Sequence, residues 1–146
     1  MAFAIAAATK CAQFPFSRWL PFAMAAPTPI SALVHSSTLV VAGVLLFIRV
    51  FSVAVILMCL IIAAAFCLTL LYSNLQALFE SDLKKLVAFS TLSHVGMMFL
   101  AAVWALSAVS LLHLVAHAFS KSLLFLLVGV CLHRGFGSQT IRGVGL

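Results

Sequence analysis

The run ALSAVSLLHLVAHAFSKSLLFLLVGVCL occupies residues 105–132, and it exceeds the roughly 20 apolar residues that a membrane-spanning helix needs. Three ionisable side chains interrupt it, at His113, His117 and Lys121. Their four-residue spacing predicts a stripe along one helix face. An ionisable group inside a bilayer is costly, faces protein or water, and marks an ion pathway. The run favours a proton-carrying helix, and the alternative is a polar seam that joins helices by hydrogen bonds.

The composition of the whole chain is that of a membrane protein. Its mean hydropathy is +1.32 and only 7% of its 146 residues are charged, which excludes an ordinary soluble domain. Long apolar runs, rather than short alternating segments, exclude a β-barrel. The net charge of +6 comes from scattered residues, so it does not indicate nucleic-acid binding. The four cysteines form no CxxC pair, and we expect no bound metal.

We therefore expect an all-α integral membrane fold over residues 1–146: about four full transmembrane helices plus a broken, Pro-interrupted N-terminal helix. Four prolines between residues 14 and 30 prevent a continuous helix there. A polar connection over residues 74–85 holds both acids, Glu80 and Asp82. The expected helical segments are the discontinuous helix at 1–28 and the spans at 30–49, 51–73, 86–104 and 105–132.

The basic residues at the ends of these spans predict an orientation. If each span crosses once, Arg49 falls on one side of the membrane. The other side receives Arg18, Lys84, Lys85, Arg134 and Arg142. By the positive-inside rule, this second side faces cytoplasm or matrix.

Two further ionisable residues, Lys10 and His35, are candidates for proton transfer. Lys10 lies in the apolar first segment, where it either snorkels to the membrane surface or is buried and exchanges a proton. His35 is followed by three hydroxyl residues that could hold ordered water beside its ring; the alternative is a histidine bonded to backbone. His94 is interpreted as a packing residue rather than an additional relay group. Because Glu80 and Asp82 lie outside the spans, a working relay needs carboxylates from another polypeptide or from missing sequence.

Several motifs carry a family resemblance. They are KCAQFPF at 10–16, WLP at 19–21, AMAAPTPISALVHSST at 23–38, SDLKKLVAFST at 81–91, HLVAHAFSKSLLF at 113–125 and IRGVGL at 141–146. Together they resemble subunit 5 of respiratory complex I, an antiporter-like, proton-pumping membrane subunit. The resemblance covers nearly the whole chain but only the middle of that family. Glutamine is common in the family at the position of His94.

The resemblance implies a part in NADH:ubiquinone oxidoreductase, with Lys10, His35, His113, His117 and Lys121 as a proton relay. It implies no cofactor in this chain; FMN, iron–sulfur clusters and ubiquinone are expected elsewhere in the complex. The expected partners are the lipid bilayer and other membrane-arm subunits, including chains that carry the missing parts of the fold. A split gene or a divided protein would explain the length. Alternatives are a subunit of a multisubunit cation/proton antiporter and a remnant that only scaffolds the membrane arm.

The expected location is the mitochondrial inner membrane, as a multi-pass protein, with the bacterial plasma membrane as alternative. The first residues, MAFAIAAATK, show neither a secretory signal nor an Arg-rich presequence. This fits an organelle-encoded or bacterial chain, and equally one that starts within a longer protein.

Overall fold

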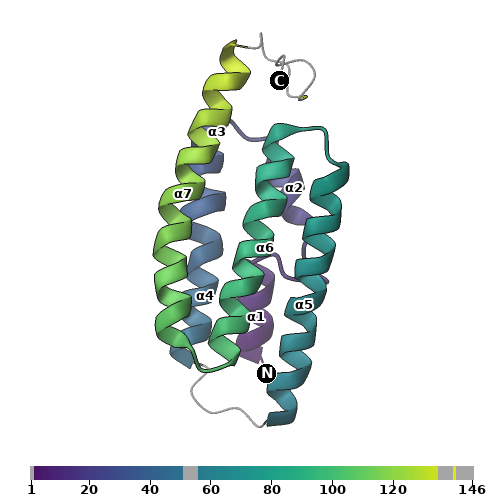
Figure 1. Cartoon of the computed structure of the whole chain (residues 1–146), viewed down its shortest axis with the longest axis vertical. Coiled ribbons are helices and arrows are strands. Elements are labelled where there is room, and N and C mark those ends of the chain that lie inside the picture. Colours follow the sequence, from purple (N-terminus) through teal and green to yellow (C-terminus); the bar gives the residue numbers. More distant parts are fainter. Residues whose placement is uncertain (1, 51–55, 135–139, 141–146) are drawn as a thin grey trace.

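The computed structural model describes residues 2–50, 56–134 and 140, and in this part every regular element is a helix (Figure 1). Side chains are described except at residues 2–4, 35–37, 50 and 56–59. Within these described residues, four helical segments are long and apolar enough to cross a membrane: Thr28–Arg49, Leu60–Phe79, Leu83–Val103 and Ser107–Arg134. The prediction of an all-α membrane bundle is therefore confirmed.

The N-terminal part is broken into short helices, as the prolines predict. These are α1 (Ala2–Lys10), α2 (Trp19–Ala23) and α3 (Thr28–Ile30). Helix α1 ends because Ala12 takes the left-handed conformation, with φ of 55°. The Gln13 amide then donates to the Ala8 carbonyl at 2.9 Å, and the Ala12 amide donates to the Thr9 carbonyl at 3.3 Å. This bonding pattern is a Schellman C-cap, which satisfies carbonyls that the helix end would leave unpaired.

Buried polar side chains hold the break in place. The Thr69 hydroxyl donates to Gln13 Oε1 at 2.8 Å, and both side chains are almost completely buried. The Trp19 Nε1 donates to the Thr9 carbonyl at 3.2 Å, which joins the segments on either side of the break. Irregular backbone at membrane depth needs such internal partners because lipid supplies none.

The segment that follows departs from the regular span expected at 30–49. It begins as a π-helix, η1 (Ser31–Thr38), and continues as α4 (Leu39–Val50). The Leu39 amide donates to the Val34 carbonyl, five residues back, and the Thr38 hydroxyl donates to the carbonyl of Leu33 at 2.9 Å. Threonine hydroxyls that bond back to helix carbonyls compete with the α-helical ladder, and π-turns are frequent at functional sites.

The remaining helices are α5 (Ile56–Phe79), α6 (Leu83–Val103) and α7 (Ser107–Arg134). The predicted polar connection at 74–85 is wrong for most of its length, because α5 continues to Phe79 and α6 begins directly after Asp82. Residues 74–79 contain neither glycine nor proline, so nothing in them stops a helix. The spans predicted at 86–104 and 105–132 are shifted to 83–103 and 107–134. Of the span predicted at 51–73, residues 51–55 lie outside the described part.

Helix α6 occupies the centre of the bundle and packs against α5, α7, α4, α2 and η1. Of the part of α6 that could span a membrane, 56% is buried inside the protein, compared with 17% for α5 and 22% for α7. Three aromatic rings fill the contact between helices: Phe66 and Phe99 stack at 4.5 Å, and Phe47 meets Phe99 edge-on at 5.1 Å. Aromatic pairs at these distances stabilise the contact beyond the area they bury. Helix α6 is thereby fixed relative to α4 and α5.

A three-residue turn, 104–106, joins α6 to α7. Ala105 is left-handed, with φ of 60°. The Leu106 amide donates to the Ala101 carbonyl at 3.0 Å, and the Ala105 amide donates to the Ala102 carbonyl at 3.1 Å. This second Schellman motif ends α6 and turns the chain back beside it.

Replacing Ala105 with glycine should raise the free energy of unfolding by about 1 kcal/mol, because a left-handed residue with a Cβ atom costs about 1–2 kcal/mol. Ala105 is exposed, so little packing is lost. Denaturant unfolding in detergent micelles, followed by circular dichroism, measures the change. The matched control is Ala64→Gly, at an exposed position inside α5, which should lower stability by about 1 kcal/mol. Equal destabilisation by both would contradict the prediction.

Replacing Thr69 with valine should lower the free energy of unfolding by about 1–3 kcal/mol, because it leaves a buried Gln13 oxygen without its donor. The same micelle unfolding experiment measures this loss. As control, Ser73→Ala removes a buried hydroxyl that bonds only within its own helix turn, and the loss should be smaller. In the double variant with Gln13→Met, the losses should be less than additive; strict additivity would show that the two side chains do not interact.

Candidate functional site

The short turn between α6 and α7 determines which side chains of the two helices meet. Because the helices run antiparallel from residues 104–106, residues at equal distances from the turn face each other. Close to the turn, the Ser110 hydroxyl on α7 donates to the Met98 carbonyl on α6 at 2.9 Å. Farther from the turn, the same register brings His94 beside His117 and Ser90 beside Lys121.

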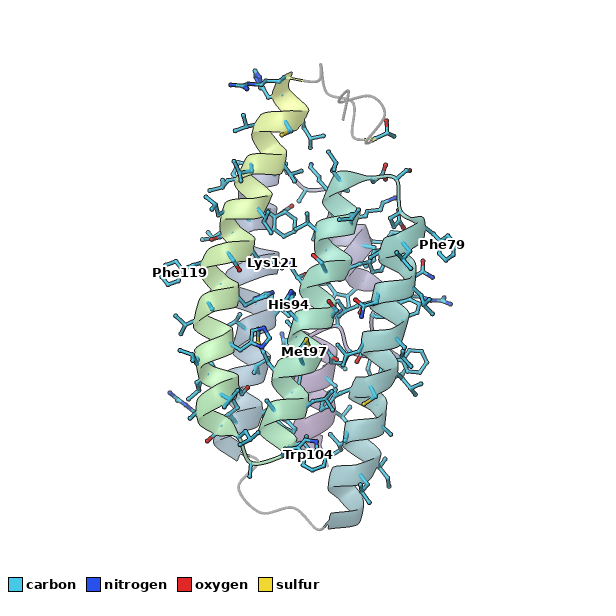
Figure 2. All side chains as sticks on the ribbon, viewed as in Figure 1. Phe79, His94, Met97, Trp104, Phe119 and Lys121 are labelled. Carbon is cyan, nitrogen blue, oxygen red and sulfur yellow. The ribbon has the colours of Figure 1, made fainter. Side chains whose placement is uncertain are left out.

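The predicted stripe on α7 lies on the face that packs against α6. His117 is 3% exposed and Lys121 is 7% exposed, while His113 is half-buried. Phe119, between them in sequence, is 75% exposed. Figure 2 shows Lys121 and His94 directed into the space between the two helices, with Phe119 pointing away from the bundle. Phe119 thus faces outward, whereas His117 and Lys121 face inward together with the buried Leu114 and Phe125.

Helix α6 supplies hydrogen-bonding partners from the opposite side. The Lys121 Nζ donates to Ser90 Oγ at 2.7 Å, and the Ser90 hydroxyl donates to the Val87 carbonyl at 2.8 Å. His94 Nδ1 and His113 Nε2 are 3.2 Å apart, within hydrogen-bonding distance. The ring centroids of His94 and His117 are 5.6 Å apart. We call Ser90, His94, His113, His117 and Lys121 the α6–α7 polar cluster.

His117 stands apart within this cluster. Among the described residues, neither of its ring nitrogens has a hydrogen-bond partner, although both are buried. Buried polar atoms in proteins are nearly always paired with protein or water. A polar, enclosed position between three other titratable groups is suited to water-mediated contacts. The chemistry available here is movement of protons between imidazole and ammonium groups.

The sequence missed two members of the cluster. Sequence reasoning does not single out Ser90, and it interprets His94 as a packing residue. A signal was present, because Ser90 and His94 are four residues apart on one helix face. That face could be paired with α7 only once the turn, and with it the register, was known.

The other two predicted relay residues lie outside the cluster or outside the described side chains. Lys10 is exposed at the end of α1, which packs against α4. Among the described residues, no hydrogen bond joins Lys10 to the α6–α7 polar cluster. The backbone of His35 lies in η1, which packs against α7, but its side chain is not among those described. Its part in proton transfer stays a prediction.

In the described part, no group of three or more His, Cys, Asp or Glu residues is arranged to hold a metal ion. Both acids of the chain lie in the α5–α6 connection. The cluster consequently contains basic and hydroxyl groups but no carboxylate of this chain.

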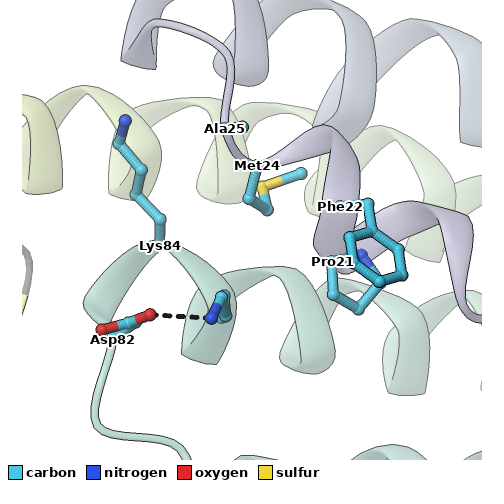
Figure 3. A pocket seen from close by; sticks show the side chains of 7 residues that line it. Pro21, Phe22, Met24, Ala25, Asp82 and Lys84 are labelled. Atoms are coloured by element: carbon cyan, nitrogen blue, oxygen red, sulfur yellow. Dashed lines mark ion pairs between the residues drawn. The ribbon is translucent and has the colours of Figure 1, made fainter.

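The start of α6 forms a separate charged end of the bundle. Lys84 is buried, and its Nζ donates to the Ala26 carbonyl at 3.3 Å, while Lys85 pairs with Asp82 at 2.9 Å. Together with Pro21, Phe22, Met24 and Ala25, these side chains line a cavity of about 350 Å³ (Figure 3). The end of α7 with Arg134 lies at this same end of the bundle, and the end of α4 with Arg49 lies at the opposite end (Figure 1). For Lys84, Lys85, Arg134 and Arg49 this arrangement agrees with the sorting of charges on which the predicted orientation rests, while Arg142 lies outside the described residues.

Comparison with known proteins identifies similar chains. This chain is 49% identical to NADH-ubiquinone oxidoreductase chain 5 of Ascaris suum, over 94% of this chain and 25% of that protein. It is 50% identical to the protein of the same name from Locusta migratoria, over 97% of this chain and 25% of that protein. The chain thus spans about a quarter of the length of these relatives. The resemblance found in the sequence motifs is confirmed.

A solved structure and a family description agree with these relatives. A chain in the structure of the Mrp complex from Dietzia sp. DQ12-45-1b matches 90% of this chain with a TM-score of 0.85 and 38% identity, although only 15% of that chain is covered. Residues 1–145 match the family described as NADH:quinone oxidoreductase/Mrp antiporter, TM. Because this match covers nearly the whole chain and the chain folds as an all-helical membrane bundle, the chain belongs to the NADH:quinone oxidoreductase/Mrp antiporter transmembrane family.

Proposed function

We propose that this chain forms part of a proton-translocating subunit in the membrane arm of respiratory complex I, where it couples electron transfer from NADH to ubiquinone to proton movement. Its similarity to NADH-ubiquinone oxidoreductase chain 5 proteins supports this assignment. The observation that carries it is the α6–α7 polar cluster, with His117 and Lys121 buried between two apolar helices. Ionisable groups inside a membrane protein are costly and mark ion pathways.

The geometry supports a stepwise proton path along α7. Lys121 can hold a proton as an ammonium group that donates to Ser90. An imidazole can accept a proton on one nitrogen and release another from the second, so His117 and His113 can pass charge along the helix. We propose that bound water completes the gaps, and that Lys10 and His35 extend the path through the broken helix and η1.

The energy for this movement comes from redox chemistry in other subunits. We propose that FMN, iron–sulfur clusters and ubiquinone are bound elsewhere in the complex. Carboxylates that balance Lys10 and Lys121 come from another polypeptide or from sequence outside these 146 residues, because these residues include only two acids and both lie in the α5–α6 connection. The membrane is the mitochondrial inner membrane, as for a subunit of this respiratory enzyme.

A subunit of a cation/proton antiporter is the second candidate, supported by the likeness to a chain of the Mrp complex. The identity of 38% to that chain is lower than the 49–50% to chain 5 proteins. A third candidate is a remnant that scaffolds the membrane arm without moving protons. Both alternatives share the fold, so only assembly and transport separate them from the proposal.

Replacing Lys121 with methionine should lower the number of protons pumped per NADH oxidised, because methionine is also unbranched and only one atom shorter but cannot carry a proton. Lys10→Met should lower it as well. The measurement is proton uptake by proteoliposomes that contain the assembled complex. The matched control is Lys85→Met, at a lysine paired with Asp82 away from the cluster, which should pump as the native complex does. Undiminished pumping in both Lys121→Met and Lys10→Met would refute the relay.

Affinity purification of the tagged chain in mild detergent should recover NADH-oxidising activity. Complex I contains the NADH-oxidising subunits, whereas a cation/proton antiporter works without them. The measurement is NADH oxidation with an artificial electron acceptor in the purified fraction, with an unrelated tagged membrane protein as control. Recovery of the chain with other antiporter subunits and without this activity would favour the second candidate.

A further inference from the structure

His94 is placed to join two residues of α7, His113 and His117. Among the described residues, no hydrogen bond or ring contact links His113 to His117. His94 meets both: its Nδ1 lies 3.2 Å from His113 Nε2, and its ring centroid lies 5.6 Å from that of His117. The path along α7 thus has a gap that a side chain of α6 bridges.

The contact between His94 and His113 constrains their protons. A hydrogen bond between two imidazole nitrogens holds one proton, so one ring donates and the other accepts. If His94 donates from Nδ1, its Nε2 is free to accept a proton, and His113 carries its own proton on Nδ1. Arrival of a proton at His94 Nε2 then permits release of the Nδ1 proton to His113 Nε2, and His113 releases its Nδ1 proton onward. One proton enters and one leaves, and both rings end neutral in the opposite tautomer.

The position of His117 supplies the entry to this step. Both of its nitrogens are buried without a partner in the described part, and it lies beside His94 in the antiparallel register. Since His94 Nδ1 is engaged with His113, the nitrogen of His94 left for exchange with His117 is Nε2. One water between the rings suffices to carry the proton, since an enclosed polar site favours an ordered bridging water.

We propose that His94 is a proton-carrying member of the relay, which receives protons from His117 and delivers them to His113. This inference rests on the proposed function and adds a residue from a second helix to it. The competing role is structural: a hydrogen bond from His94 that holds α6 and α7 together. The two roles differ in whether position 94 must bind and release a proton or only form a hydrogen bond.

Asparagine at position 94 separates these roles. Its amide places a polar atom at the same number of bonds from the backbone as Nδ1 of histidine, so it can keep the contact with His113, but it does not titrate. His94→Asn should lower the protons pumped per NADH oxidised by the same factor as Lys121→Met, in proteoliposomes that contain the assembled complex. The matched control is His133→Asn, at an exposed histidine near the end of α7, which should pump as the native complex does.

The outcomes distinguish the two proposals. If Lys121→Met and Lys10→Met both pump normally, the proposed relay fails. If Lys121→Met is impaired and His94→Asn pumps normally, the relay stands and the role of His94 is refuted. His94→Gln is measured in parallel, with assembly checked by NADH oxidation with an artificial acceptor. Failure of both amide variants to assemble would show a structural role and would also overturn the inference.

Discussion

The antiparallel contact between α6 and α7 is the constraint on which the rest of the candidate site depends. A three-residue turn, closed by the left-handed Ala105, fixes the register of the two helices. Because the register is fixed, the ionisable residues of α7 meet Ser90 and His94 rather than lipid. Helix α6 can supply these partners because it is the most buried of the spans. Its Phe99 packs against Phe47 of α4 and Phe66 of α5, which fixes its position in the bundle.

The broken helix obeys the same physical rule as the polar cluster. Inside a membrane every polar group needs an internal partner, since lipid offers none. At the break, Gln13 bonds to Thr69 of α5, and the C-cap at Ala12 satisfies the helix carbonyls. In the cluster, Ser90 Oγ accepts a hydrogen bond from the ammonium group of Lys121. His117 of the cluster is different, because its ring nitrogens have no hydrogen-bond partner in the described part. Proton exchange is proposed at this residue.

Membership of the NADH:quinone oxidoreductase/Mrp antiporter transmembrane family is compatible with a basic cluster that contains no acid of this chain. The chain covers about a quarter of the length of similar chain 5 proteins. A relay of lysine and histidine alone carries positive charge, and nearby carboxylates would stabilise it. The supply of those carboxylates from outside these 146 residues is therefore part of the proposed function.

The sequence by itself determined the helical membrane fold, the broken N-terminal segment and the stripe of His113, His117 and Lys121, because apolar length, proline chemistry and helical periodicity are local properties. It misplaced the end of α5, since polar residues near a membrane surface do not stop a helix. Only the tertiary structure decided that His94 belongs to the cluster. Contacts between helices depend on register and packing, which no periodicity within one helix encodes.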